Sequence, residues 1–172
     1  MTCVWDSLIK GIPIDQLNEV IGNKKKLDPS KKKKYDHKEK SLKKDLKRDI
    51  FVKYLQKNIR KTSKVSVNGE QLTEQQINEN FKAIQSLSAN NICDGYYCST
   101  CDPFLILVCE LFECSIFHTY MNSHIKYECT DSKFIMYLRS SSTHMSHNRT
   151  TIINNSDHFE YMSNKFELSA DN

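Results

Sequence analysis

One apolar segment constrains the fold more than any other part of the chain. Residues 104–112 are almost all hydrophobic, which predicts a helix that is buried on most of its sides. Asp102 and Pro103 stand directly before it. Aspartate is favoured as the N-cap of a helix, and proline is favoured at the first helical position. We therefore expect this helix to lie at the centre of the fold.

Strand patterns follow the apolar helix, and helical patterns precede it. Residues 115–121, 124–129 and 133–139 are rich in β-forming residues, and the short polar breaks between them suit tight turns. Residues 66–69 also form a turn signal. Helical spacing is found at residues 3–11, 14–21, 42–59 and 73–87, and Thr73 with Gln76 forms a capping-box pattern at the start of the last one. A last hairpin is predicted from strands at residues 150–153 and 158–162.

Length and composition predict one domain over residues 1–163, followed by a loose tail over residues 164–172. No apolar run reaches membrane-spanning length, and no signal peptide precedes Cys3. The odd number of cysteines, seven, favours a reducing compartment. We expect a cytoplasmic monomer that makes no membrane contact and holds no cofactor or metal.

The charge of the chain is divided unevenly. Residues 24–64 contain 18 of the 25 basic residues and 5 of the 21 acidic residues, a local balance of +13, and the rest of the chain has a balance of −9. Within this stretch, residues 23–41 are Lys-rich, and like charges at this density favour a mobile, solvated segment. Contacts with nucleic-acid phosphates or with an acidic protein surface are the functional alternatives.

The first helical segment places a cysteine at its start. Thr2 is a suitable N-cap, so Cys3 falls in the first turn of the helix over residues 3–11. The free N–H groups and the positive end of a helix favour the thiolate form of a cysteine, which is the reactive form. We interpret Cys3 as a nucleophile; the alternative is a small hydrophobic residue near a chain terminus.

The run Cys3-Val4-Trp5-Asp6-Ser7-Leu8 resembles the start of the nucleophile helix in papain-like cysteine proteases. It is most similar to the ovarian-tumour (OTU) family of deubiquitinating enzymes, especially its virus-encoded members. The resemblance continues over residues 92–147, through Gly95, the apolar helix and the strand that follows it. It implies an α+β, papain-like domain in which helices pack around a small, mostly antiparallel sheet. It also implies cleavage of ubiquitin or a ubiquitin-like modifier, in host cytoplasm or a virion if the chain is viral.

The same resemblance implies a catalytic histidine, and two positions compete for it. His144 lies where a fourth strand after the apolar helix would begin, as in the family, and we place the catalytic base there. His158 is the alternative, because the residues around it match the local family pattern. Ser146 would orient His144, whereas Glu160 would orient His158. In either case Cys3 attacks an isopeptide carbonyl and the histidine moves the proton.

One departure from the family pattern leaves other functions open. OTU enzymes carry an Asp-Gly-x run before the cysteine that helps to form the oxyanion hole, and only Met1 and Thr2 precede Cys3 here. An inactive OTU-fold protein that binds ubiquitin, a host protein or nucleic acid is therefore an alternative. A zinc module is another, with Cys93, Cys98 and Cys101 as ligands and a fourth ligand from Cys129 or His124.

Overall fold

We describe the protein from a computed structural model, which describes residues 3–21, 43, 46–62 and 64–153. The fold is α+β. Its helices are α1 (Cys3–Gly11), α2 (Ile14–Ile21), α4 (Arg48–Lys57), α5 (Glu74–Ser86), α6 (Ala89–Asp94) and α7 (Pro103–Phe112). Its strands are β1 (Val65–Val67), β2 (Glu70–Gln71), β3 (Cys114–Tyr120), β4 (Ser123–Cys129), β5 (Phe134–Ser140) and β6 (Met145–Ile152).

The strands form a mixed sheet in the order β2-β1-β4-β3-β5-β6. Its pairings are antiparallel except for β3 with β5, which run parallel. The tight turn predicted after β4 suggests that β4 and the next strand are neighbours in the sheet. The short connection there does not join neighbouring strands. It carries the chain past β3 to its other side. Residues 134–138 are buried at every position, which is typical of a central strand, and β5 pairs with β3 along one edge and with β6 along the other.

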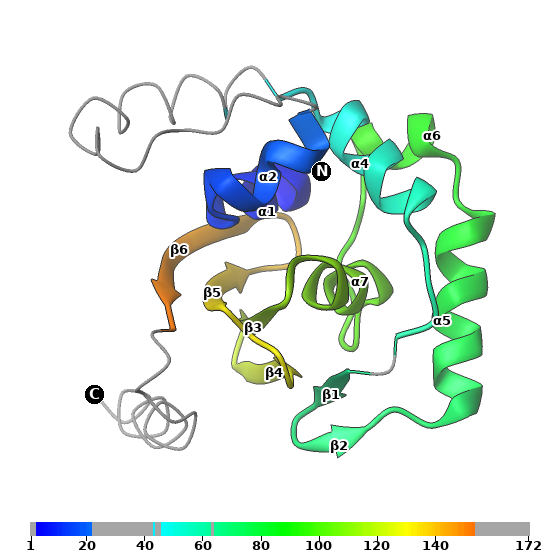
Figure 1. Ribbon diagram of the computed structural model, residues 1–172, viewed down its shortest axis with the longest axis vertical. Helices are drawn as coiled ribbons and strands as arrows, with labels where there is room; N and C mark the ends of the chain where they lie inside the picture. Colours follow the sequence, from blue (N-terminus) through cyan, green and yellow to red (C-terminus); the bar gives the residue numbers. More distant parts are fainter. Residues whose placement is uncertain (1–2, 22–42, 44–45, 63, 154–172) are drawn as a thin grey trace.

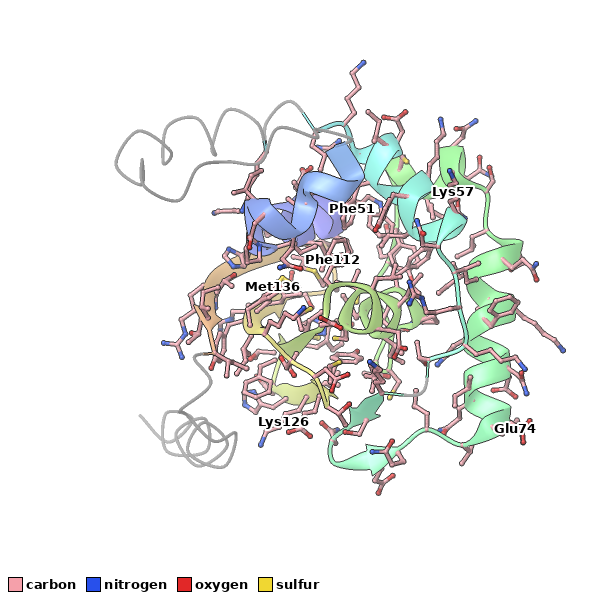
Figure 2. The ribbon with its side chains drawn as sticks, viewed as in Figure 1. Phe51, Lys57, Glu74, Phe112, Lys126 and Met136 are labelled. Carbon is pink, nitrogen blue, oxygen red and sulfur yellow. The ribbon has the colours of Figure 1, made fainter. Side chains whose placement is uncertain are left out.

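The apolar helix α7 lies at the centre of the fold, as predicted. Figure 1 shows it between the strands of the sheet and α5. Asp102 is its N-cap and Pro103 its first residue, and nearly all of its side chains are buried. Phe112 stacks on Phe51 of α4, with ring centroids 6.2 Å apart (Figure 2). This aromatic contact joins α4 to the central helix α7.

Helix α1 has the predicted bounds and lies beside β6 (Figure 1). Gly11 allows the close approach. A Cβ atom at this position would lie 2.7 Å from the sulfur of Met136 and 2.8 Å from Cδ2 of His147. Met136 lies between β5 and α1 (Figure 2). Because glycine has no side chain, the end of α1 can rest directly on the sheet.

Trp5 fixes the other side of α1. Its ring is fully buried, and its Nε1 donates a hydrogen bond of 2.8 Å to the carbonyl of Ile92. The indole stacks on Tyr96 and meets Phe104 edge to face, in both cases with centroids 5.1 Å apart. A buried tryptophan whose N–H is paired holds two elements in one orientation. The start of α1 is thereby placed against α7 and the loop before it.

Two predicted elements differ in part from the structure. Within the helix expected over residues 42–59, Lys43 is helical, Lys47 has extended backbone angles (φ −69°, ψ 140°), and α4 begins at Arg48. The predicted turn at Asn68 and Gly69 is confirmed and joins β1 to β2, and β1 also pairs with β4. In place of a short strand over residues 150–153, β6 runs from Met145 to Ile152 along β5.

Other predictions are confirmed or lie outside the described residues. The capping box of α5 is present: Thr73 and Gln76 exchange side-chain and backbone hydrogen bonds. Helix α2 also has its predicted bounds. The Lys-rich segment, the tail over residues 164–172 and the N-cap role of Thr2 lie outside the described residues. Among the helices that are described, none is long and apolar enough to cross a membrane.

Candidate functional site

The fold brings Cys3 to the residue that follows His144. The backbone N–H of Met145 donates a hydrogen bond to Cys3 Sγ, with 3.4 Å between nitrogen and sulfur. One turn further along α1, the Ser7 hydroxyl donates to the Met145 carbonyl at 3.1 Å. These contacts join residues 142 and 138 positions apart. They fix the start of α1 against the start of β6.

His144 occupies the position predicted for the catalytic base, immediately before β6. Its backbone carbonyl accepts a hydrogen bond from the N–H of Ser141 at 2.8 Å, which closes the turn between β5 and β6. Its ring is exposed, and among the described residues it has no hydrogen-bond partner. Ser146, the expected orienting residue, donates its hydroxyl to the carbonyl of Arg139 at 3.4 Å. His158 and Glu160 lie outside the described residues.

A small pocket opens beside this contact. Its volume is about 90 Å³, and it lies where α1, the loop before α7 and the turn between β5 and β6 meet. Its wall is formed by Val4, Tyr97, Cys98, Tyr120, Ser140, Ser141, Ser142, His144 and Met145. Cys3 is not part of this wall, but Met145, whose N–H contacts Cys3 Sγ, and Val4, the next residue along α1, both line the pocket.

The wall of the pocket near α7 is held by a buried carboxylate. Asp102 has no exposed surface. Burial raises the pKa of its carboxyl above the ordinary range, and its hydrogen bonds oppose that shift. Its oxygens accept hydrogen bonds, at 2.8 to 3.3 Å, from the Tyr96 hydroxyl and from the backbone N–H groups of Ser99, Phe104 and Leu105. The loop that carries Tyr97 and Cys98 is therefore rigidly attached to the start of α7.

The second thiol at the pocket has a different environment from that of Cys3. Burial, followed by the charge of Asp102 and a hydrogen bond to it, raises the pKa of the Cys98 thiol far above its usual value. A thiol that stays protonated is a poor nucleophile. Cys98 therefore forms part of the wall and is not suited to attack a substrate.

Two polar residues at the pocket, one in its wall and one behind it, were not predicted from the sequence. His118 of β3 is fully buried, and its Nε2 lies 2.6 Å from Oγ of Ser140 on β5. Burial lowers the pKa of His118 to about 4, so its ring is neutral near neutral pH. The signal was present in the alternation of the strands: His118 follows Cys114 and Ile116, and Ser140 follows Met136 and Leu138, on the buried face.

His147 is a third histidine near the site, but its contacts are structural. Its Nε2 lies 2.8 Å from the Thr150 hydroxyl, which in turn donates to the carbonyl of Gly11 at 2.6 Å. Gly11 is eight residues after Cys3, which is about 12 Å along the axis of an α-helix. His147 therefore secures the C-terminal end of α1, away from the thiol.

In the part of the chain that the structure describes, no three histidine, cysteine or carboxylate side chains lie close enough together to hold a metal ion. The zinc alternative therefore has no site there. Cys93 is buried, Cys101 is exposed, and His124 lies on the surface of β4. Cys129 belongs to the core beside Cys109 and Cys114, and burial raises its pKa to about 11. Cys109 and Cys114 are fully buried in the same core.

No protein-family model, curated protein or solved structure matches the chain. The fold and the site define an α+β protein with a mixed six-stranded sheet among its described residues, in which Cys3 Sγ contacts the N–H of Met145 and both His144 and Met145 line a small pocket. The OTU resemblance accordingly stays a prediction that depends on the residues quoted for it.

Proposed function

We propose that this chain is a papain-like, OTU-type cysteine isopeptidase with Cys3 as nucleophile and His144 as general base. The observation that carries the proposal is the hydrogen bond from the Met145 N–H to Cys3 Sγ, which places the thiol beside His144. Consecutive Cα atoms are about 3.8 Å apart. A rotation of the exposed His144 side chain can therefore bring an imidazole nitrogen toward the sulfur without a change in the backbone.

In the proposed reaction, Cys3 and His144 act in both the formation and the hydrolysis of a thioester. His144 takes the proton of the Cys3 thiol, and the thiolate forms a C–S bond with the carbonyl carbon while the carbonyl π electrons move to oxygen. As the C–O double bond reforms, the C–N bond breaks and the amine leaves with the proton from His144. A water molecule then attacks the thioester, His144 accepts a proton from it, and the carboxylic acid and the free thiol are released.

The small volume of the pocket supports a substrate whose acyl group has small side chains. A volume of about 90 Å³ leaves room for a narrow segment near the scissile bond. A ubiquitin-like modifier, which the resemblance implies, is the substrate class that we propose. Its carbonyl would approach Cys3 while the rest of the modifier stays outside the pocket.

A ubiquitin that carries a C-terminal electrophile tests this function. The intact protein should gain the mass of one ubiquitin, and Cys3→Ala should abolish the gain. We expect His144→Ala to slow the reaction by about 100-fold or more, because a positioned base contributes that much to proton transfer. Cys98→Ala is the matched control at the other pocket thiol and should react like the wild type.

Two results would contradict the proposal. Labelling that survives in Cys3→Ala would exclude Cys3 as the nucleophile. Loss of labelling in His158→Ala, with His144→Ala unaffected, would move the base to the alternative histidine.

The exposed His144 ring, without a hydrogen-bond partner among the described residues, favours a second candidate function. An inactive relative that binds a modifier would need no oriented base. In that case the wild type should bind ubiquitin in a calorimetric titration and acquire no covalent label. Binding that is unchanged in Cys3→Ala would support this alternative.

A further inference from the structure

The pair formed by His118 and Ser140 has a spare hydrogen-bond donor. Ser140 is 7% exposed and lines the pocket, and among the described residues its hydroxyl has one partner, His118 Nε2, at 2.6 Å. A hydroxyl can donate one hydrogen bond and accept others. The direction of the bond to His118 therefore decides whether the Ser140 proton is available to a molecule in the pocket.

The surroundings of the His118 ring indicate that direction. His118 Nδ1 is buried, and no described residue offers it a hydrogen-bond partner. If Nδ1 carried the proton, a buried N–H would be left unpaired, which folded proteins rarely allow. With the proton on Nε2, the ring donates to Ser140 Oγ, and only a lone pair at Nδ1 is left unpaired. Because the pKa of His118 is lowered to about 4, the ring carries only one proton near neutral pH, on either Nδ1 or Nε2.

In this tautomer the Ser140 O–H has no acceptor among the described residues and faces the pocket. The backbone places it close to the reacting sulfur. Ser140 is the register partner of Met145, the residue whose N–H contacts Cys3 Sγ. The Ser140 carbonyl accepts a hydrogen bond from the N–H of Met121 at 3.0 Å, which holds this end of β5 in place. A rigid donor one strand away from the thiol is positioned to meet a substrate atom.

We propose that Ser140, held by His118, donates the hydrogen bond that stabilises the carbonyl oxygen of the acyl group attacked by Cys3. This inference rests on the proposed function. When the C–S bond forms, the carbonyl π electrons move to oxygen, and the Ser140 O–H donates a hydrogen bond to that oxyanion without giving up its proton. His118 is a positioning residue, because it acts through Ser140.

Two reagents that react with the same thiol through different transition states test the inference. An N-acetyl-glycylglycine p-nitrophenyl ester acylates Cys3 through an oxyanion, whereas iodoacetamide alkylates it by displacement of iodide without one. Ser140→Ala should slow acylation by about 100-fold, the usual effect of one lost oxyanion donor, and leave the alkylation rate within about twofold. Ser86→Ala, at an exposed serine of α5 that does not line the pocket, is the matched control and should change neither rate.

Further variants separate catalysis from folding. Ser140→Thr retains a hydroxyl and should recover most of the acylation rate. His118→Ala should slow acylation, and the double variant with Ser140→Ala should be no slower than Ser140→Ala alone, since both changes act through one donor. An unchanged alkylation rate shows that the Cys3 site is folded in each variant.

The outcomes distinguish the inference from the proposed function. If the wild type acylates no faster than Cys3→Ala, the proposed function fails, and the inference fails with it. If the wild type acylates at Cys3 and Ser140→Ala acylates equally fast, only the inference is overturned. An equal loss of acylation and alkylation in Ser140→Ala would also overturn it, because it would show a structural role for Ser140.

Discussion

Two helices of this protein begin near the same pocket, and their first turns are arranged in opposite ways. At the start of α7, Asp102 is fully buried and its oxygens accept hydrogen bonds from the loop and from the first turn of the helix. At the start of α1, Cys3 is half-buried and contacts the Met145 N–H. Asp6, the acidic residue in the first turn of α1, lies on the surface and pairs with Arg48.

The contrast shows how one fold can separate rigidity from reactivity. The carboxylate at α7 satisfies the donors around it and, together with burial, keeps Cys98 protonated. The hydrogen bond that reaches the thiol at α1 comes from the backbone N–H of Met145. One helix start holds the wall of the pocket, and the other carries the proposed nucleophile.

Replacement of the buried aspartate should have the largest effect. In Asp102→Ala, the Tyr96 hydroxyl, the Ser99 N–H and the first N–H groups of α7 lose their acceptor in the core. We expect the free energy of unfolding to fall by about 3 kcal/mol or more, the sum of a lost N-cap and buried donors left unpaired. Urea unfolding followed by the fluorescence of Trp5, which lies against Tyr96, measures the loss. A loss below about 1 kcal/mol would show that the Asp102 cluster is not the rigid element of the site.

The second largest effect should be the difference in reactivity between the thiols of Cys3 and Cys98. Because the pKa of Cys98 is raised, its thiolate fraction at pH 7 is very small, and its reactivity falls in proportion. We expect iodoacetamide to modify Cys3 about 100-fold faster than Cys98, as measured by mass spectrometry of proteolytic peptides over a time course. Cys101, which is exposed, serves as an internal reference. Equal rates at Cys3 and Cys98 would remove the distinction between the two helix starts.

The surface aspartate of α1 should have the smallest effect. Asp6 accepts two hydrogen bonds of 2.7 Å from Arg48, but both side chains are about half exposed. Exposed ion pairs and charges near a helix start each contribute at most about 1 kcal/mol. Asp6→Ala should therefore lower the free energy of unfolding by less than about 1 kcal/mol in the same urea experiment. A loss as large as that of Asp102→Ala would mean that α1 depends on its acidic first turn as much as α7 does.

Much of the local structure could be predicted from the sequence, because the signals that set helix ends act over three or four residues. Thr73 with Gln76, and Asp102 with Pro103, marked the starts of α5 and α7 correctly. The bounds of α1 and the positions of β3, β4 and β5 also followed from local patterns. The place of His144 at the start of the fourth strand after α7 is a consequence of that order. The extended backbone of Lys47, which separates helical Lys43 from α4, was not predicted from the helical spacing.

The sequence by itself thus determined an apolar central helix, its cap, the strands that follow it and a cysteine at the start of the first helix. Only the tertiary structure decided that β5 lies parallel to β3, that Cys3 meets the residue after His144, and that His118 is buried against Ser140. The physical reason is range. Capping and periodicity depend on neighbours along the chain, whereas strand order depends on which apolar faces can be buried together, and that choice brings residues 142 positions apart into contact.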